Sequence, residues 1–184
     1  MKRRDALRSL ALLTGGLVLV PSCDFSEEEI LSAYDRLKVS SSMRELLGQI
    51  TDTIIPSGNL KGASDLDIQD FILVMVNDCM DEDAQKSFMK GFNSFDAYSK
   101  DKKGKKFSDL ERMEKEEVVQ TGLHEESEDK NDLRGFLGTT KRFTIQGFLL
   151  SEYMQTEVKS YSLIPGDYQG EVLIESLKKE KLNG

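Results

Sequence analysis

The sequence predicts an all-α protein, with a single compact domain of about six helices after a cleaved signal peptide. Apolar residues recur at steps of three and four along most of the chain, and no alternation of apolar and polar residues continues beyond a few positions. The length of 184 residues suits one domain rather than two. Three capping-box patterns mark expected helix starts: Ser26 with Glu29, Ser42 with Glu45, and Ser108 with Glu111.

The first half of the mature chain predicts three helices. Residues 26–37 and 42–55 each follow a capping box, and Pro56 ends the second of these helices and begins a loop. Asp65 can cap a third helix that extends to Cys79. Because this third helix is apolar on almost every side, we expect it to be central, with Cys79 as an inert core residue.

The second half predicts an aromatic helix, an acidic helix and the stretches that flank them. Residues 83–99 place phenylalanines on one face, and residues 108–120 form an acidic amphipathic helix. The basic stretch 100–106 is interpreted as a solvated loop, with a contact to anionic headgroups or to a partner as the alternative. Residues 122–132 are interpreted as a solvated acidic linker that carries His124.

A long helix is expected from Leu133 to Tyr161. Pro165 and Gly166 end it, and a weak helix over 171–179 follows. Its core seam alternates steps of four and three: Phe136, Thr140, Phe143, Gly147, Leu150, Met154, Val158 and Tyr161.

Composition and charge exclude several classes of protein. Two Cys and one His cannot supply a disulfide framework or a zinc finger. The net charge of −8 would repel nucleic acid, although the first 22 residues are basic. No sequence motif for covalent haem, a dinucleotide or a nucleotide phosphate is present, so we expect no cofactor in this chain.

Residues 1–22 are interpreted as a secretory signal peptide. A basic stretch precedes an apolar run from Leu10 to Val20, which would rise about 16 Å as a helix against roughly 30 Å of hydrocarbon. The Arg3-Arg4 pair resembles a twin-arginine signal, which exports proteins that have already folded, although Ala6 stands where an aromatic residue is usual.

Cys23 is expected to be the first residue of the mature chain and to carry lipid. The sequence Val20-Pro21-Ser22-Cys23 resembles a bacterial lipobox, and the alternative is an ordinary signal followed by a chance Cys. Acyl chains would hold the protein on a membrane surface facing the periplasm or the cell exterior. Residues 23–41 would then be a tether and first helix, and residues 42–184 the helical domain.

Two further segments resemble the signatures of the gluconate 2-dehydrogenase subunit 3 family. The opening signature is Thr51-Asp52-Thr53-Ile54-Ile55-Pro56, followed by Gly62-Ala63 and Asp65, with Lys61 in place of a proline. The closing signature comprises Lys141 to Phe148, Ser151-Glu152, Tyr161 and Pro165 to Gly170. Their order and spacing extend the resemblance over about residues 43–172, and Glu171 stands where many relatives have Cys.

The resemblance implies a non-catalytic small subunit of an exported, membrane-associated dehydrogenase. In such complexes a large FAD subunit oxidises a sugar or polyol, and a haem c subunit often accepts the electrons. The small subunit would carry the folded flavin subunit across the membrane by its own twin-arginine signal, and would stabilise and anchor it.

Two other functions compete with this one. A stand-alone surface lipoprotein could bind a ligand or a protein partner without redox chemistry. A small hydrolase is disfavoured, because no pair of nucleophile and base is evident and His124 is expected to be solvated.

The segment from Phe143 to Tyr168 is expected to contact the partner. It carries more aromatic and apolar groups than one seam needs, including Ile145 and Leu149. The alternative is a central helix that is buried all round. The candidate interface residues are Phe148, Tyr153, Tyr161, Pro165 and Tyr168.

Overall fold

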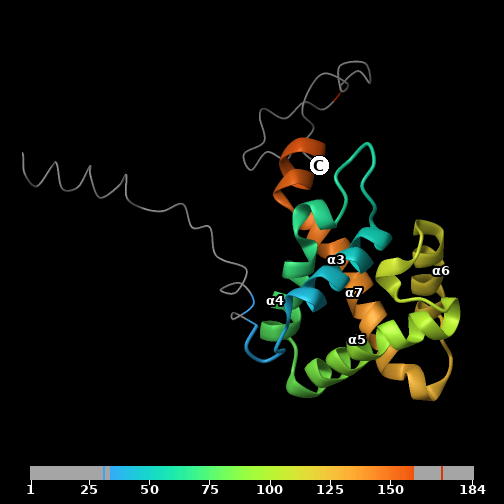
Figure 1. Ribbon diagram of the computed structural model, residues 1–184. Helices are drawn as coiled ribbons and strands as arrows, with labels where there is room; N and C mark the ends of the chain where they lie inside the picture. The colour runs from blue at the N-terminus through green and yellow to red at the C-terminus, as the bar shows by residue number, and fades with distance from the viewer. Residues whose placement is uncertain (1–30, 32–33, 160–170, 172–184) are drawn as a thin grey trace, which may run out of the picture.

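The computed structural model describes residues 31, 34–159 and 171 and confirms the all-α class. These residues form five α-helices, three short 3₁₀ turns and one π-helical turn, and none of them lies in a strand (Figure 1). The α-helices are α3 (Ser41–Ile54), α4 (Ile68–Cys79), α5 (Glu82–Lys103), α6 (Arg112–Leu123) and α7 (Asn131–Leu150). The shorter elements are η1 (Ser64–Leu66), η2 (Phe107–Asp109), η3 (Glu128–Lys130) and the π-helical η4 (Met154–Val158).

Helix α7 is the centre of the fold. In Figure 1 it lies behind α3, and α5 runs across its lower part. It contacts all four of the other α-helices, most extensively α5 and then α4. The side chains on its inner face are buried: Leu133, Phe136, Leu137, Thr140, Phe143, Thr144, Gly147 and Phe148.

The α5–α7 crossing is built from aromatic rings and one glycine. The ring centroid of Phe136 lies 5.1 Å from that of Phe88, 5.2 Å from that of Phe92 and 5.9 Å from that of Phe95, all edge to face. Gly91 sits directly on the α7 backbone: a Cβ there would lie 2.6 Å from Cβ of Phe136 and 2.7 Å from the carbonyl carbon of Asp132. The absent side chain is therefore what lets the two helices approach so closely.

The helix starts differ from three of the predicted caps. Helix α3 begins after Ser40, whose Oγ accepts from the Met43 N–H at 3.3 Å, rather than after Ser42. Asp65 lies inside η1, so it does not cap α4. The capping box of α6 is Glu111 with Glu114, because Ser108 lies inside the turn η2.

The predicted long helix from Leu133 to Tyr161 is interrupted. α7 ends at Leu150, and Ser151 is extended with ψ 148°, before the chain resumes as the π-helical η4. Beyond Gly147 the predicted seam holds only at Met154, which is 8% exposed, whereas Leu150 is 63% exposed and Val158 is 38% exposed. Tyr161, the last expected seam residue, lies outside the described residues.

Three smaller expectations also change. Cys79 is exposed rather than in the core, since it is the last residue of α4. Lys100 to Lys103 belong to α5, and Lys102 and Lys103 pair with Glu125 and Glu117, so the first half of the stretch 100–106 is not a solvated loop. Its second half, from the left-handed Gly104 (φ 72°) to Lys106, is an exposed loop as predicted. Residues 122–132 contain the end of α6 and the turn η3 rather than a linker, although His124 is exposed as expected.

Several predictions fall outside the described residues. These concern Arg3 and Arg4, Cys23, and the interface residues Tyr161, Pro165 and Tyr168. Within the part of the chain that the structure describes, no helix combines the length and the apolar character needed to span a bilayer.

Candidate functional site

The opening signature forms a loop that is fastened to the end of α3. Pro56 follows the last helical residues, as predicted, and the loop closes where the Ala63 N–H donates to the Ile55 carbonyl at 2.9 Å. Ser64 Oγ donates to Asp52 Oδ1 at 3.0 Å, which joins η1 to α3. Asp65 Oδ2 accepts from the Gly62 N–H at 2.8 Å, so Asp65 serves the loop instead of a helix start.

Gly62 is the tightest position of this loop. A Cβ on Gly62 would lie 2.5 Å from the Ser57 backbone nitrogen and 2.8 Å from Asp52 Oδ1. Any side chain would push the loop away from α3 and break the contacts of Asp52. The signature therefore fixes the path of the backbone between α3 and η1.

The closing signature shapes the other end of α7. Thr144 Oγ1 donates to the Thr140 carbonyl at 2.7 Å inside the helix. Gly147 faces the ring of Phe71 on α4, whose Cδ1 would lie 2.6 Å from a Cβ at this position. Ser151 ends the helix and starts the next turn, because its Oγ donates to the Phe148 carbonyl at 2.8 Å and accepts from the Met154 N–H at 3.2 Å.

The two signatures meet in space. The Lys61 N–H donates to Tyr153 Oη at 3.3 Å, and Lys61 Nζ lies 4.8 Å from the centroid of the Tyr153 ring. Beside this contact lies a groove of about 630 Å³, which we call the signature groove. It is lined by residues of both segments and of α4, including Leu66, Phe71, Gly147, Leu150, Ser151 and Tyr153.

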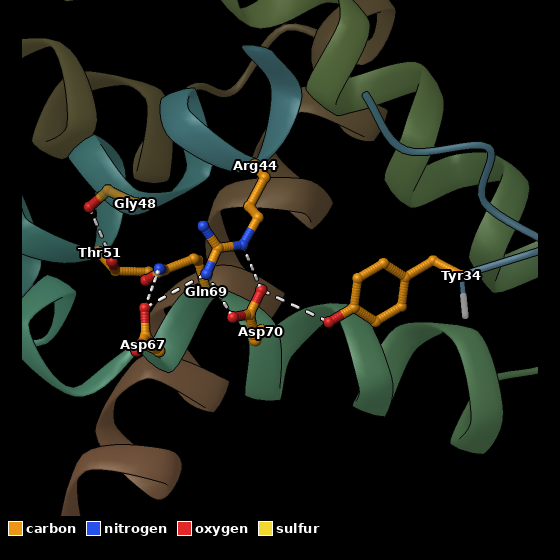
Figure 2. A network of polar contacts seen from close by, with 7 residues as sticks. All are labelled: Tyr34, Arg44, Gly48, Thr51, Asp67, Gln69 and Asp70. Atoms are coloured by element: carbon orange, nitrogen blue, oxygen red, sulfur yellow. Dashed lines mark hydrogen bonds and ion pairs between the residues drawn. The ribbon is translucent and has the colours of Figure 1, made fainter. Parts of the chain in front are cut away.

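A polar network lies at the start of α4 (Figure 2). The guanidinium of Arg44 binds Asp70 through Nε to Oδ1 at 2.7 Å and through Nη2 to Oδ2 at 2.5 Å, and its Nη2 also contacts Asp67 Oδ1 at 3.2 Å. Tyr34 Oη donates to Asp70 Oδ1 at 3.4 Å. The network therefore ties α4 both to α3 and to the chain that precedes α3.

Two groups of this network have raised pKa values. Burial, together with the charge of Asp70, raises the pKa of Tyr34 to about 12. The side-chain hydrogen bond with Asp70 raises the pKa of Arg44 further above its ordinary value. Tyr34 therefore stays protonated and Arg44 stays charged at neutral pH, and the hydrogen bonds between them and Asp70 hold the elements together.

A second cleft, of about 790 Å³, lies between α3, the signature loop and α6. Its lining is polar and of mixed charge, with Arg44, Glu45, Asp52, Lys115 and Glu116 among the contributors. Among the described residues, no group of three or more His, Cys, Asp or Glu could hold a metal ion.

The predicted interface residues within the described chain have different surroundings. Phe148 is only 9% exposed, so its ring belongs to the packed side of α7 rather than to the surface. Tyr153 is half-buried and is engaged by Lys61. The exposed apolar residues of the predicted segment are instead Ile145, Leu149 and Leu150, and Val158 beyond them.

Sequence reasoning missed the Arg44–Asp70 pair. Its members stand 26 positions apart on different helices, and no local pattern joins them. The pairing of Lys61 with Tyr153 was missed for the same reason, although each residue stands within or beside a signature.

The comparisons with known proteins agree with these motifs. The family model described as gluconate 2-dehydrogenase subunit 3 matches residues 42–166, which include the opening signature and most of the closing one. Neither the curated proteins nor the solved structures gave a match. Because the family model matches well over half of the chain, this chain belongs to the gluconate 2-dehydrogenase subunit 3 family.

Proposed function

We propose that the protein is the non-catalytic small subunit of an exported, membrane-associated, FAD-dependent sugar or polyol dehydrogenase. The observation that supports this most strongly is membership of a family that is itself a dehydrogenase subunit. In this proposal FAD, and haem c where a cytochrome subunit is present, are held by the partners. The small subunit assists the export, stability and membrane attachment of the flavin subunit.

The geometry of the signatures supports an accessory role. Their polar groups are used by one another: Asp52 binds Ser64, Asp65 binds the Gly62 N–H, and Ser151 binds the backbone at the end of α7. Polar groups that are hydrogen-bonded within the chain in this way fix the path of the backbone and so the shape of the surface. A rigid surface of defined shape is what a permanent partner subunit requires.

The amino-terminal signal gives this role a mechanism. A flavin protein that acquires FAD before export must cross the membrane folded, and a twin-arginine signal containing Arg3 and Arg4 allows that. In this proposal the flavin subunit has no signal of its own and is exported together with this chain. Acylation at Cys23 would then keep the assembled complex at the membrane.

Co-purification tests the proposal directly. The full chain, tagged at its carboxyl terminus and expressed in its native host, should recover a larger protein that releases FAD on denaturation. Recovery of the tagged chain alone would contradict the proposal and favour a stand-alone lipoprotein.

Export and anchoring are tested with two variants. Arg3→Lys combined with Arg4→Lys should retain both this chain and the flavin subunit in the cytoplasm, whereas normal export of the flavin subunit would refute shared export. Cys23→Ser should release the complex from membranes, and mass analysis that finds Cys23 unmodified within an intact chain would refute the lipid anchor.

A further inference from the structure

One face of α7 is exposed although the helix is the centre of the fold. Arg134, Gly138, Arg142, Ile145 and Leu149 follow one another at steps of four, four, three and four, so they form a single stripe along the helix. We call this stripe the α7 outer face. All five residues are exposed, with Ile145 at 41% and Leu149 at 42%.

The α7 outer face differs in charge from the rest of the protein. The chain carries a net charge of −8, yet no Asp or Glu occurs between Leu133 and Ser151. The basic residues of the stripe, Arg134 and Arg142, make no ion pair with another described residue. The stripe therefore presents positive charge beside apolar side chains on a molecule whose net charge is negative.

Its basic side chains are held in place without being neutralised. Arg134 donates from Nη1 to the Glu125 carbonyl at 2.8 Å and from Nη2 to Asn131 Oδ1 at 2.7 Å. The guanidinium carbon of Arg142 lies 4.5 Å from the centroid of the Phe143 ring. Fixing these long side chains in advance lowers the entropy that a partner would have to remove.

The middle of the stripe has room for a partner. A Cβ on Gly138 would meet no atom within 4 Å, so this glycine is not needed for packing inside the chain. A side chain of another protein can approach the α7 backbone there, between Arg134 and Arg142. The apolar pair Ile145 and Leu149 then lies within the same contact area.

We propose that the α7 outer face is the docking surface for the flavin subunit, which presents carboxylates around an apolar centre. This inference rests on the proposed function and adds the location and chemistry of the contact. Charge complementarity supports it, because carboxylates on the partner would be attracted to Arg134 and Arg142, neither of which pairs with a described carboxylate. A second copy of this chain is disfavoured as the partner, because a symmetric pairing through this face would place the arginines of one copy beside the arginines of the other.

A charge-reversed pair tests the docking surface. The variant Arg142→Glu with Ile145→Asp should reduce the flavin protein recovered with the tagged full chain at least tenfold. A control on α5, Lys86→Glu with Asn93→Asp, makes the same change in net charge at two exposed positions and should keep recovery within twofold of wild type. Circular dichroism and thermal melting of both variants report whether the fold is intact.

A second measurement does not depend on reversing a charge. A photo-reactive phenylalanine analogue in place of Ile145 should crosslink to the flavin subunit, and the same analogue in place of Lys86 should not. Full recovery of the flavin protein by the charge-reversed pair, or crosslinking from Lys86 instead of Ile145, overturns the docking surface and leaves the proposed function standing. Absence of a flavin protein from the wild-type chain overturns both.

Discussion

The two ends of α7 are built in different ways. At the α5–α7 crossing, the Phe136 ring is enclosed by the rings of α5, and Gly91 brings the two backbones together. At the other end, one glycine, Gly147, meets one ring, Phe71, and the signature groove remains open beside them. The first region is closed by apolar packing, whereas the second is shaped by individual hydrogen bonds.

The two ends of α7 therefore differ in what they contribute: one end supplies most of the aromatic packing, and the other carries most of the family signature. The crossing buries four aromatic rings, and their removal from water should contribute substantially to the stability of the fold. Most of the signature residues lie at the looser end, where Asp52, Gly62 and Ser151 direct the backbone. The signature residues therefore fix the shape of the surface at this end of α7. Substitutions in the two regions should have different consequences.

The largest expected effect comes from Gly91→Ala at the crossing. The new methyl group would overlap the Asp132 backbone and the Phe136 Cβ, so α5 and α7 must separate. Overpacking of this kind costs about 3 kcal/mol of unfolding free energy, which chemical denaturation would measure.

Gly135→Ala is the matched control for this change. A Cβ on Gly135 meets nothing within 4 Å, so the variant should be more stable by up to about 1 kcal/mol through helix propensity. Equal changes in the free energy of unfolding for Gly91→Ala and Gly135→Ala would show that both glycines act through helix propensity alone. That result would contradict the close contact at the crossing.

Much of the fold follows from local sequence, and the errors have identifiable causes. The 3.6-residue period located α3 to α7, because each helix must bury one stripe. Two of the predicted caps, Asp65 and Ser108, lie inside 3₁₀ turns that the apolar period does not indicate. At α3, Ser40 and Ser42 are both suitable cap residues, and the structure uses Ser40. The break at Ser151 carries no Pro or Gly, so the apolar period alone extended α7 too far.

The site was less predictable than the fold. The signature motifs located its parts, but the contact between Lys61 and Tyr153 spans 92 positions and needs the whole fold. The placement of Phe148 depended on the rotation of α7, which a sequence with apolar residues on several faces does not define. For the same reason, the exposed pair Ile145 and Leu149 could not be separated from the buried residues beforehand.

At the looser end, Gly147→Ala should destabilise the protein less than Gly91→Ala. The new Cβ meets the edge of the Phe71 ring, which can move into the signature groove, rather than a backbone. We expect a loss of about 2 kcal/mol, measured by chemical denaturation. The double variant Gly147→Ala with Phe71→Leu should recover part of this loss, and its failure to do so would indicate that the clash lies elsewhere.

A smaller effect is expected for Tyr153→Phe. The change removes the hydroxyl that accepts from the Lys61 N–H but leaves the ring beneath Lys61 Nζ. The cost should be about 1 kcal/mol, and amide exchange should accelerate at the loop more than at the crossing. Uniform acceleration across the molecule would show that the contact does not act locally.

The smallest expected effect concerns the rim of the crossing, where Asp132 lies in the first turn of α7. Its pKa is lowered by the hydrogen bond and charge of Lys90, at 2.5 Å, and by Ser87 Oγ at 2.7 Å. A carboxylate with a lowered pKa in the folded state stabilises that state above its unfolded pKa of about 3.9 and loses this contribution as the pH falls through the folded value. Asp132→Asn should therefore lower the melting temperature slightly at pH 7, and the difference from wild type should disappear as the pH falls through the lowered pKa of Asp132. Glu128→Gln on the exposed turn η3 provides the control, and a difference for Asp132→Asn that persisted unchanged into acid would mean that the residue acts through packing rather than through its charge.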